Sequence, residues 1–211
     1  MNTPVVPMRF ATAAEEFQTA WDDPAHTQFE MPPVDVNRVL RDRYRVAPPK
    51  RLTRSMIWDM ELKKAWDPRT YIPYTVSEGG SWGRHKLQDG SERFSRSSVQ
   101  RGWITPEQGR VLEDVYVGHA EQRIFFQGRA TLTAEDGRQL LASDFQPLFN
   151  VEHGASGSDD EPLNLWRIVI LTPSKDLRYI EPFEKRVQAG LLPGFIEIYI
   201  EKDLRTHLSR I

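Results

Sequence analysis

The first third of the chain has hydrophobic positions spaced three and four apart, the pattern of helices that bury one face. This spacing predicts a helix over about residues 10–22, a second from Asp35 to the prolines at 48 and 49, and a third over residues 54–66. Asp35 is a suitable N-cap for the second helix, and Asp67 followed by a proline is suitable to begin a short further helical turn. This part of the chain is therefore predicted to be helical, with breaks at its Pro-Pro and Asp-Pro steps.

From Gly79 onward the pattern changes to the alternation that is typical of strands. Asp89-Gly90, between SWGRHKL and SERFSRSSV, predicts a hairpin turn, and Glu135-Asp136-Gly137 predicts the turn of a longer second hairpin. RVLEDVYV and LNLWRIVILT are predicted as further strands, and Thr105 begins a predicted helical turn. Residues 195–211 have apolar positions at helical spacing, which predicts a terminal amphipathic helix.

The predicted order is helices, then an antiparallel meander, then a helix, which indicates an α+β protein. A curved antiparallel sheet should form a cone around the N-terminal helices, with extra helices at both ends of the chain. We expect residues 1–53 to be an N-terminal helical extension and residues 54–172 to be the core domain. Residues 173–211 should be a helical extension that packs on this core.

Composition narrows the function classes. Of the 211 residues, 27% are charged and 39% are hydrophobic, which is typical of a soluble globular protein. A net charge of −2 argues against a nucleic-acid-binding protein, which would be basic. The chain has no cysteine, so disulfides, thiolate nucleophiles and zinc fingers are excluded. Because we find neither a signal peptide nor an apolar run long enough to span a membrane, we expect a cytoplasmic protein with no membrane partner.

The third predicted helix carries the first candidate for chemistry. Trp58, Asp59, Leu62 and Trp66 fall on one stripe, so a carboxylate lies among side chains that should face a core. A lone carboxylate is costly to bury and must be paired, hydrogen-bonded or protonated. Two interpretations follow. Asp59 either pairs with Lys63 at the edge of the stripe, or faces a cavity between helix and sheet as a general acid or base.

The first hairpin contributes basic side chains. Alternation puts Arg84 and His85 on opposite faces of their strand, so one of them should point inward unless a bulge intervenes. Together with Arg96 on the paired strand, they form either a solvated surface or a wall that binds a phenolate or another anion.

The second hairpin is apolar but is punctuated by polar residues. Phe149 and His153 share one face of the return strand, with Asn150 on the other, unless Pro147 introduces a bulge that reverses this parity. His153 is expected to be a capped core histidine, whereas Asn150 could project into a pocket. Arg167 interrupts the last apolar strand, which implies a buried partner acid.

Metal and nucleotide sites are not indicated. The five histidines are scattered, without an H-x-H or H-E-x-x-H motif, and residues 79–83 do not match G-x-G-x-x-G. We therefore expect no metal and no cofactor.

A family resemblance rests on the segments MIWDMELKKAWDP, GRATLTAEDGRQLLASDFQPLF and LNLWRIVILT. A helix with an aromatic–Asp pair, a short helical piece and a strand-rich half resemble the nuclear-transport-factor-2-like (SnoaL-like) superfamily over about residues 54–172. Trp58-Asp59 matches the aromatic–Asp pair that faces the pocket in the scytalone dehydratases, with Trp replacing Tyr. The long N-terminal helical segment departs from the family pattern. The resemblance implies a blind apolar pocket suited to proton transfer without a cofactor.

Within that superfamily, the aromatic-rich sequence resembles the sphingomonad diarylpropane lyases, which remove formaldehyde from lignin-derived diols to leave a stilbene. The resemblance implies a lyase that acts on a hydroxylated aromatic through a quinone methide. The residues expected to take part in catalysis are Asp59, His85, Arg84, Tyr74 and His119. The residues expected to bind substrate are Trp58, Tyr71, Arg96, Trp103, Phe126, Phe149 and Asn150.

Three alternatives stay open at this point. The chain could be a polyketide or steroid cyclase, dehydratase or isomerase, or a cone that binds an aromatic ligand without catalysis. The main rival fold is the Bet v 1-like helix-grip cavity, which requires a strand before the helices that the sequence does not make evident. The expected partner is a small aromatic molecule, and the resemblance implies a homodimer.

Overall fold

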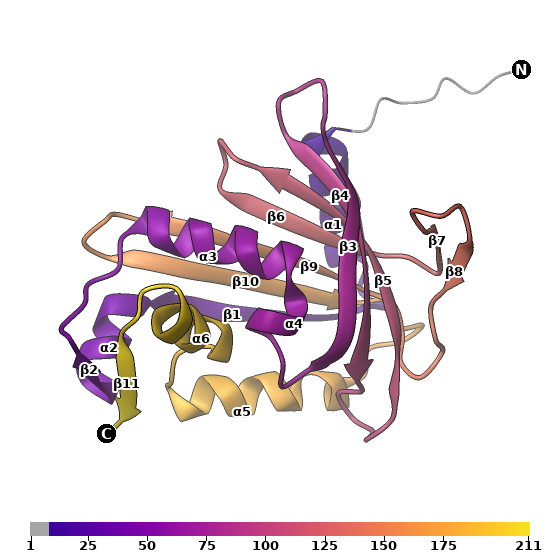
Figure 1. Ribbon diagram of the computed structural model, residues 1–211. Helices are drawn as coiled ribbons and strands as arrows, with labels where there is room; N and C mark the ends of the chain where they lie inside the picture. The colour runs from indigo at the N-terminus through magenta and orange to yellow at the C-terminus, as the bar shows by residue number, and fades with distance from the viewer. Residues whose placement is uncertain (1–8) are drawn as a thin grey trace, which may run out of the picture.

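The computed structural model describes residues 9–211 and consists of one large sheet with helices on both of its faces (Figure 1). In chain order the helices are α1 Phe10–Asp22, α2 Val36–Arg43, α3 Arg54–Trp66, α4 Pro68–Tyr71, the 3-10 helix η1 Leu177–Tyr179, α5 Glu181–Ala189 and α6 Gly194–Lys202. The first strands are β1 Thr27–Asp35, β2 Tyr44–Ala47, β3 Val76–Lys86, β4 Glu92–Arg101, β5 Gln108–Gly118 and β6 Arg123–Gly128. The remaining strands are β7 Thr131–Thr133, β8 Gln139–Leu141, β9 Phe149–Gly157, β10 Pro162–Ile170 and β11 His207–Arg210.

The main sheet has seven antiparallel strands in the order β1-β10-β9-β6-β5-β4-β3. The predicted α+β class with a curved antiparallel sheet is confirmed (Figure 1). A strand before α2 and α3, of the kind that the helix-grip arrangement requires, is present as β1, although α1 precedes it. The sheet therefore begins within residues 1–53, the segment expected to be a helical extension.

Two prolines explain why β1 was not predicted from the sequence. Pro32 and Pro33 were predicted to be a break, but they lie inside the strand, where the register with β10 shifts between Met31 and Val34. β1 is an edge strand and pairs only with β10. An edge strand tolerates proline because the missing N–H would have faced no partner.

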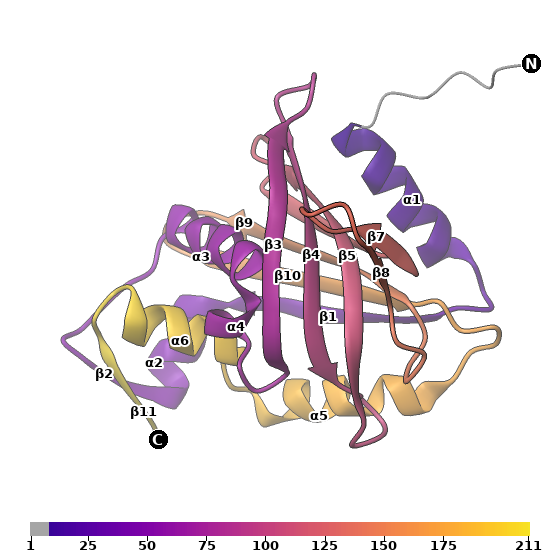
Figure 2. The ribbon, with the colours of Figure 1, turned by 45° about the vertical axis from the view of Figure 1, so that its right-hand side comes forward.

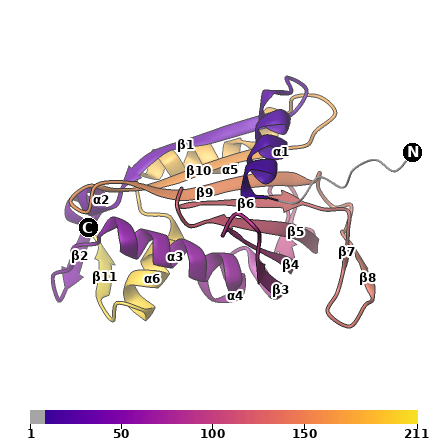
Figure 3. The same cartoon turned by 90° about the horizontal axis from the view of Figure 1, so that it is seen from above.

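The two faces of the sheet are covered by different helices (Figure 2). α1 packs on the outer face, where Phe10, Phe17, Tyr116 and Phe125 form a separate aromatic cluster. α3, α4 and α6 pack on the inner face, around the larger core. Seen from above, α1 and α3 lie on opposite sides of the strands (Figure 3). The inner face is therefore the one that a curved sheet and its helices can enclose.

The predicted helix starts are confirmed by their caps. Asp35 accepts a hydrogen bond from the backbone N–H of Arg38, and Asp67 accepts one from that of Thr70. The first hairpin forms between β3 and β4, but its register shifts between Trp82 and His85. Gly83, with φ of +68°, lies inside this bulge. The bulge breaks the strict alternation that was predicted for Arg84 and His85.

Other local predictions are wrong. The turn at Thr105 is not helical. The second hairpin is divided, because β7 pairs with β8 near the turn while β6 pairs with β9. The terminal helix ends at Lys202, and the last residues form β11, which pairs with β2. α5, which the sequence did not predict, ends at Gly190 in the left-handed conformation and leads the chain into α6.

Candidate functional site

A cavity of about 650 Å³ lies between the inner face of the sheet, β1, the segment that follows α4, and the segment that runs from α5 into α6. Its walls are mainly aromatic and aliphatic, with Trp103, Phe126, Phe149, Trp166 and Phe183 among the lining side chains. Its volume is within the range of pockets that hold small organic molecules. The space predicted between helix and sheet therefore exists, although the helix presents a different face to it than expected.

Helix α3 supplies the polar end of the cavity. Its buried face contains Ile57, Met60, Glu61 and Lys64, which recur at helical spacing. Glu61 is fully buried, and Lys64 is 3% exposed and lines the cavity. Two adjacent turns thus bring a carboxylate and an ammonium group to the inner face of the sheet.

Lys64 is held by three groups. Its Nζ forms an ion pair with Glu61, lies 2.8 Å from His153 Nδ1 and sits 3.9 Å from the centre of the Phe195 ring. Behind the pair, Asn164 Nδ2 donates to the other oxygen of Glu61 at 2.6 Å. The alternation along β9 places His153 on this face together with Phe149. Lys64 is therefore fixed at the cavity wall with its charge compensated from behind.

A second charged pair lies beside the first. Arg96 on β4 donates to Glu113 on β5, with Nε at 2.8 Å from the carboxylate, and its Nη1 donates to the carbonyl of Ala65 at the end of α3. Both Arg96 and Glu113 line the cavity and are almost completely buried. The guanidinium lies 4.5 Å from the centre of the Phe126 ring. The inner end thus holds two cations, each matched by its own carboxylate.

The buried ionisable groups at this end of the cavity shift one another's pKa values. Burial, the largest single effect, would raise the pKa of Glu61, but the charges of Lys64 and His153 and the hydrogen bonds from both together lower it to about 2. Burial lowers the pKa of Lys64 to about 8, despite the opposing effect of Glu61. Burial and the charge of Lys64 lower the pKa of His153 to about 4. At neutral pH the cluster therefore contains a carboxylate, an ammonium group close to its pKa, and a neutral imidazole.

The mouth of the cavity is framed by aromatic residues. Phe183 on α5 packs against Phe29, Trp103 and Trp166, with ring centres 4.8–5.6 Å apart. Tyr74 also lines the cavity; although the residue is 47% exposed, its phenol packs against Gly194 at the start of α6, and burial raises the pKa of its hydroxyl to about 12. α5 thus borders one side of the cavity with Phe183, Arg186, Val187 and Ala189, of which Phe183 is buried.

Some of the residues expected in the site are in the cavity wall. Tyr74, Arg96, Trp103, Phe126 and Phe149 all line it. Their roles in binding or catalysis stay a prediction.

Asp59, the residue expected to act as the catalytic acid, lies outside the cavity. Asp59 does not line the cavity, and its side chain is 47% exposed. It pairs with Lys63 at 2.8 Å, as the first interpretation had it, and accepts a hydrogen bond from Tyr199 Oη at 2.8 Å. The stripe that was expected to face inward is thus rotated, because the buried face of α3 includes Glu61 and Lys64 instead.

The expected bases and arginine of the first hairpin also lie outside. Arg84 and His85 are both exposed, because the bulge at Gly83 turns this end of β3 toward solvent. Arg84 pairs with Glu92, and His119 contacts the same carboxylate at 3.2 Å. Arg84, Glu92 and His119 thus form a surface network, and neither they nor His85 line the cavity.

Three expected binding residues are buried without lining the cavity. Trp58 packs edge-on against His119, with ring centres 5.9 Å apart. Tyr71 donates to Asp203 at 2.8 Å, and Asn150 accepts from the backbone N–H of Gly128 at 3.0 Å. Asn150 belongs to the face of β9 opposite to His153, as the alternation predicted.

The sequence missed Glu61 and Lys64, and gave His153 only a structural role. The signal was an i, i+3 acid–base pair between the apolar residues Ile57, Met60 and Ala65. The partner acid predicted for Arg167 is found in Glu152, whose Oε2 lies 2.5 Å from Arg167. That pair lies on the outer face and is not part of the cavity.

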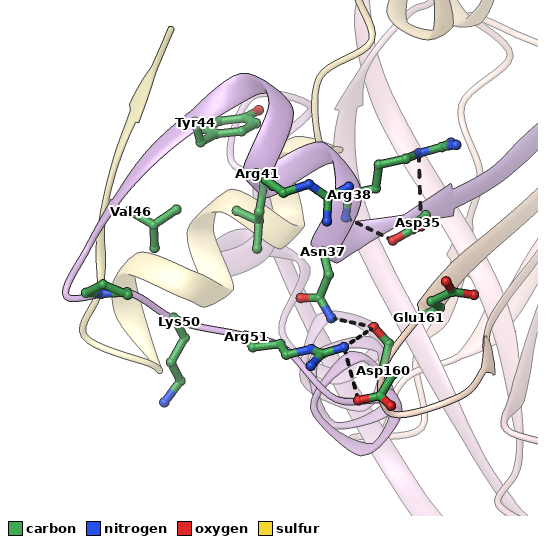
Figure 4. A pocket seen from close by; sticks show the side chains of 12 residues that line it. Asp35, Asn37, Arg38, Arg41, Tyr44, Val46, Lys50, Arg51, Asp160 and Glu161 are labelled. Atoms are coloured by element: carbon green, nitrogen blue, oxygen red, sulfur yellow. Dashed lines mark hydrogen bonds and ion pairs between the residues drawn. The ribbon is translucent and has the colours of Figure 1, made fainter.

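A second pocket, of about 640 Å³, lies on the surface around α2 (Figure 4). Four of its charged side chains form two ion pairs: Arg51 with Asp160 at 3.0 Å, and Arg38 with Asp35 at 4.0 Å. It has few apolar atoms to hold an organic ligand, so the inner cavity is the stronger candidate. Among residues 9–211, no group of three or more His, Asp or Glu side chains is arranged to hold a metal ion. In the same range, no helix is both long and apolar enough to cross a membrane.

Comparisons with known proteins give weak likenesses only. The Zhui aromatase/cyclase from Streptomyces sp. R1128 aligns with a TM-score of 0.47 at 12% identity, over 83% of this chain and 95% of that protein. The di-domain ARO/CYC StfQ from the steffimycin biosynthetic pathway has a TM-score of 0.47 at 8% identity, over 89% of this chain and 52% of that protein. Major latex-like protein 151 from Panax ginseng has a TM-score of 0.36 at 12% identity, over 80% of this chain and 96% of that protein. No family model and no curated protein sequence matches the chain, so its function has to be argued from its own geometry.

Proposed function

We propose that the chain is an enzyme that carries out acid–base chemistry on an oxygenated aromatic or polyketide-like molecule held in the inner cavity. Cyclisation, dehydration or isomerisation is the reaction class that the site supports best. The observation that carries the proposal is an aromatic cavity whose buried end gathers Lys64, Arg96 and His153, with Glu61 and Glu113 as counter-ions.

The charges at the buried end of the cavity indicate which class of ligand can bind there. Each cation already has a carboxylate partner, so an anionic ligand would have to displace a buried acid, which is unfavourable. A neutral ligand with a carbonyl or phenol oxygen can accept hydrogen bonds from Lys64 or Arg96 without breaking either pair. The aromatic walls favour a flat, apolar body.

Proton transfer follows from the state of the cluster. Lys64, with a pKa of about 8, can donate a proton to a carbonyl oxygen on which negative charge develops. The guanidinium of Arg96 can stabilise the same oxygen. His153, neutral at pH 7, accepts a hydrogen bond from Lys64, and the amine left when Lys64 has given up its proton can take a proton from the carbon next to the carbonyl group. Together these groups can move a proton from carbon to oxygen, the step that cyclases, dehydratases and isomerases share.

Two adjacent lysines make a matched test. Lys64 lines the cavity, whereas Lys63 pairs with Asp59 and Asp203 on the outer side of α3. We expect the double variant Glu61→Gln/Lys64→Gln, which removes both charges of the pair together, to lower turnover of linear polyketones or hydroxylated aromatic ketones by at least about 100-fold. Lys63→Gln should retain turnover. Product formation is followed by mass spectrometry, and equal turnover in the two variants would contradict the proposal.

A second candidate is the aldehyde-releasing lyase on a diaryl diol. It is favoured by a third polar group in the cavity wall, the Tyr74 phenol, which adds to Lys64 and Arg96 and suits a molecule with several oxygen atoms. Tyr74 or Lys64 would then take the role first assigned to Asp59 and assist departure of a benzylic hydroxyl. Release of formaldehyde from a diaryl diol, measured beside the polyketone reactions, separates the two candidates.

A further inference from the structure

Lys64 has the surroundings of a nucleophilic amine. Its Nζ is at the wall of an aromatic cavity and close to the Phe195 ring, so water has little access to it. An amine attacks a carbonyl carbon only after it has lost its proton, and desolvation beside another cation favours that loss. Arg96 is the neighbouring cation, and its charge contributes to lowering the pKa of Lys64.

A proton acceptor is already in contact with this amine. His153 Nδ1 lies 2.8 Å from Lys64 Nζ, and the ammonium group donates to it. The neutral imidazole therefore carries its own hydrogen on Nε2 and a lone pair on Nδ1. Glu61 remains the carboxylate that neutralises the positive charge of this site.

We propose that Lys64 Nζ forms a covalent Schiff base with a ketone or aldehyde carbon of the molecule held in the cavity. The inference rests on the proposed function, which puts a carbonyl group at this end. His153 takes one proton from the ammonium group, and the free amine adds to the carbonyl carbon to give a carbinolamine. The carbinolamine then loses its hydroxyl as water, using the proton held by His153. One ammonium and one carbonyl become one iminium and one water, with no oxidant or reductant.

The charge of the buried cluster supports this step. The iminium carries the same single positive charge as the ammonium that it replaces, so Glu61 keeps its counter-ion throughout. A Lys–Glu pair that had only to hold α3 to the sheet would need no contact with the cavity, yet Lys64 lines it while Glu61 lies behind.

A Schiff base at Lys64 would also define the substrate class. An iminium draws electrons from the neighbouring bonds, so loss of a proton from the adjacent carbon gives an enamine. The enamine can attack a second carbonyl group and close a ring, or the reverse reaction can break a bond and release an aldehyde. The substrate is therefore a ketone or aldehyde with a second carbonyl or a hydroxyl group at the β position.

Pentane-2,4-dione tests the amine itself, because it converts a reactive lysine into a stable enaminone that absorbs in the near ultraviolet. The whole chain is treated with this dione at neutral pH, and the adduct is located by peptide mass spectrometry. We expect one principal adduct, of one dione less one water, on Lys64. Lys63→Gln should keep this adduct, and Lys64→Arg, which leaves Glu61 with a cation, should lose it.

The outcomes separate this inference from the proposed function. An adduct spread over surface lysines, or none on Lys64, overturns the Schiff base, and turnover of polyketones by the same protein would then leave the proposed function standing. An adduct on Lys64 in a protein that turns over no carbonyl substrate supports the reactive amine and counts against the proposed function. Borohydride reduction during turnover adds a direct check, since it should fix the substrate to Lys64 and to no other lysine.

Discussion

At the scale of single residues, Asp59 and Glu61 are two carboxylates on one helix in opposite surroundings. Asp59 is half exposed and pairs with an exposed lysine, whereas Glu61 has no exposed surface and neutralises a buried one. Exposed ion pairs contribute little to stability because solvent screens them. Removal of one partner from a buried pair leaves a charge in a medium that cannot solvate it.

Asn and Gln substitutions turn this contrast into a prediction. Asp59→Asn should lower the free energy of unfolding by less than about 1 kcal/mol and leave aromatic ligand affinity unchanged. Glu61→Gln should lower that free energy by about 3–5 kcal/mol, because Lys64 loses its counter-ion. Urea denaturation followed by circular dichroism measures both values. Similar losses of unfolding free energy in the two variants, or a loss of ligand binding in Asp59→Asn alone, would contradict the position of Asp59 outside the cavity.

His153 gives a pH dependence. Its pKa is about 4 in the folded protein and about 6.5 in the unfolded chain, so the unfolded state binds a proton first as the pH falls. The stability that His153 contributes is complete above pH 6.5 and should decline by up to roughly 3 kcal/mol as the pH falls to 4. Glu61 adds its own loss only below its unfolded pKa of 4.5. Unfolding free energies measured between pH 7 and 4.5 should therefore slope in the parent chain and be flatter in His153→Gln.

At the scale of elements, α5 is attached to the cavity mouth mainly through Phe183, which is 3% exposed. Phe183→Ala should cost about 3–5 kcal/mol, the usual range for loss of a buried phenylalanine. We also expect aromatic ligands to bind at least tenfold more weakly, because α5 closes one side of the cavity. Lys185→Ala, on the exposed side of the same helix, is the control and should change both quantities little. Fluorescence titration with 2-naphthol measures the affinity, and an unchanged affinity in Phe183→Ala would show that α5 does not help to enclose the ligand.

The elements also show how far the sequence could predict the structure. The starts of helices with clear caps, such as those after Asp35 and Asp67, and the hairpin at Asp89-Gly90 depend on local interactions and are found as predicted. The end of the second helix is not, because α2 stops at Arg43 and the next four residues form β2. β1 and β11 were missed because each is defined by a distant partner strand, β10 or β2. The inward face of α3 was misassigned because periodicity counts Glu61 and Lys64 as surface residues. Only the three-dimensional structure shows that Glu61 and Lys64 are buried and neutralise each other.

At the scale of the whole molecule, the fold leaves a space on the inner face of its sheet that the side chains do not fill. Val151 and Val115 lie on this face, but Val151 lines the cavity, whereas Val115 is fully buried outside the cavity lining. Enlarging Val115 to Phe should force neighbours apart and cost about 1–3 kcal/mol. Enlarging Val151 to Phe should cost less, because the new ring can occupy the cavity.

The same pair tests the space as a binding site. A ligand that binds only the folded chain stabilises it by about 2.7 kcal/mol at a concentration of 100 times its Kd. The melting temperature of the parent chain should therefore rise with added 2-naphthol, and that of Val115→Phe should rise by a similar amount from a lower start. Val151→Phe should melt near the parent value and gain little from the ligand, because the ring occupies the space that the ligand needs. If 2-naphthol stabilised Val151→Phe as much as the parent, the ligand would have to bind elsewhere on the molecule. That result would contradict the assignment of the inner cavity as the functional site.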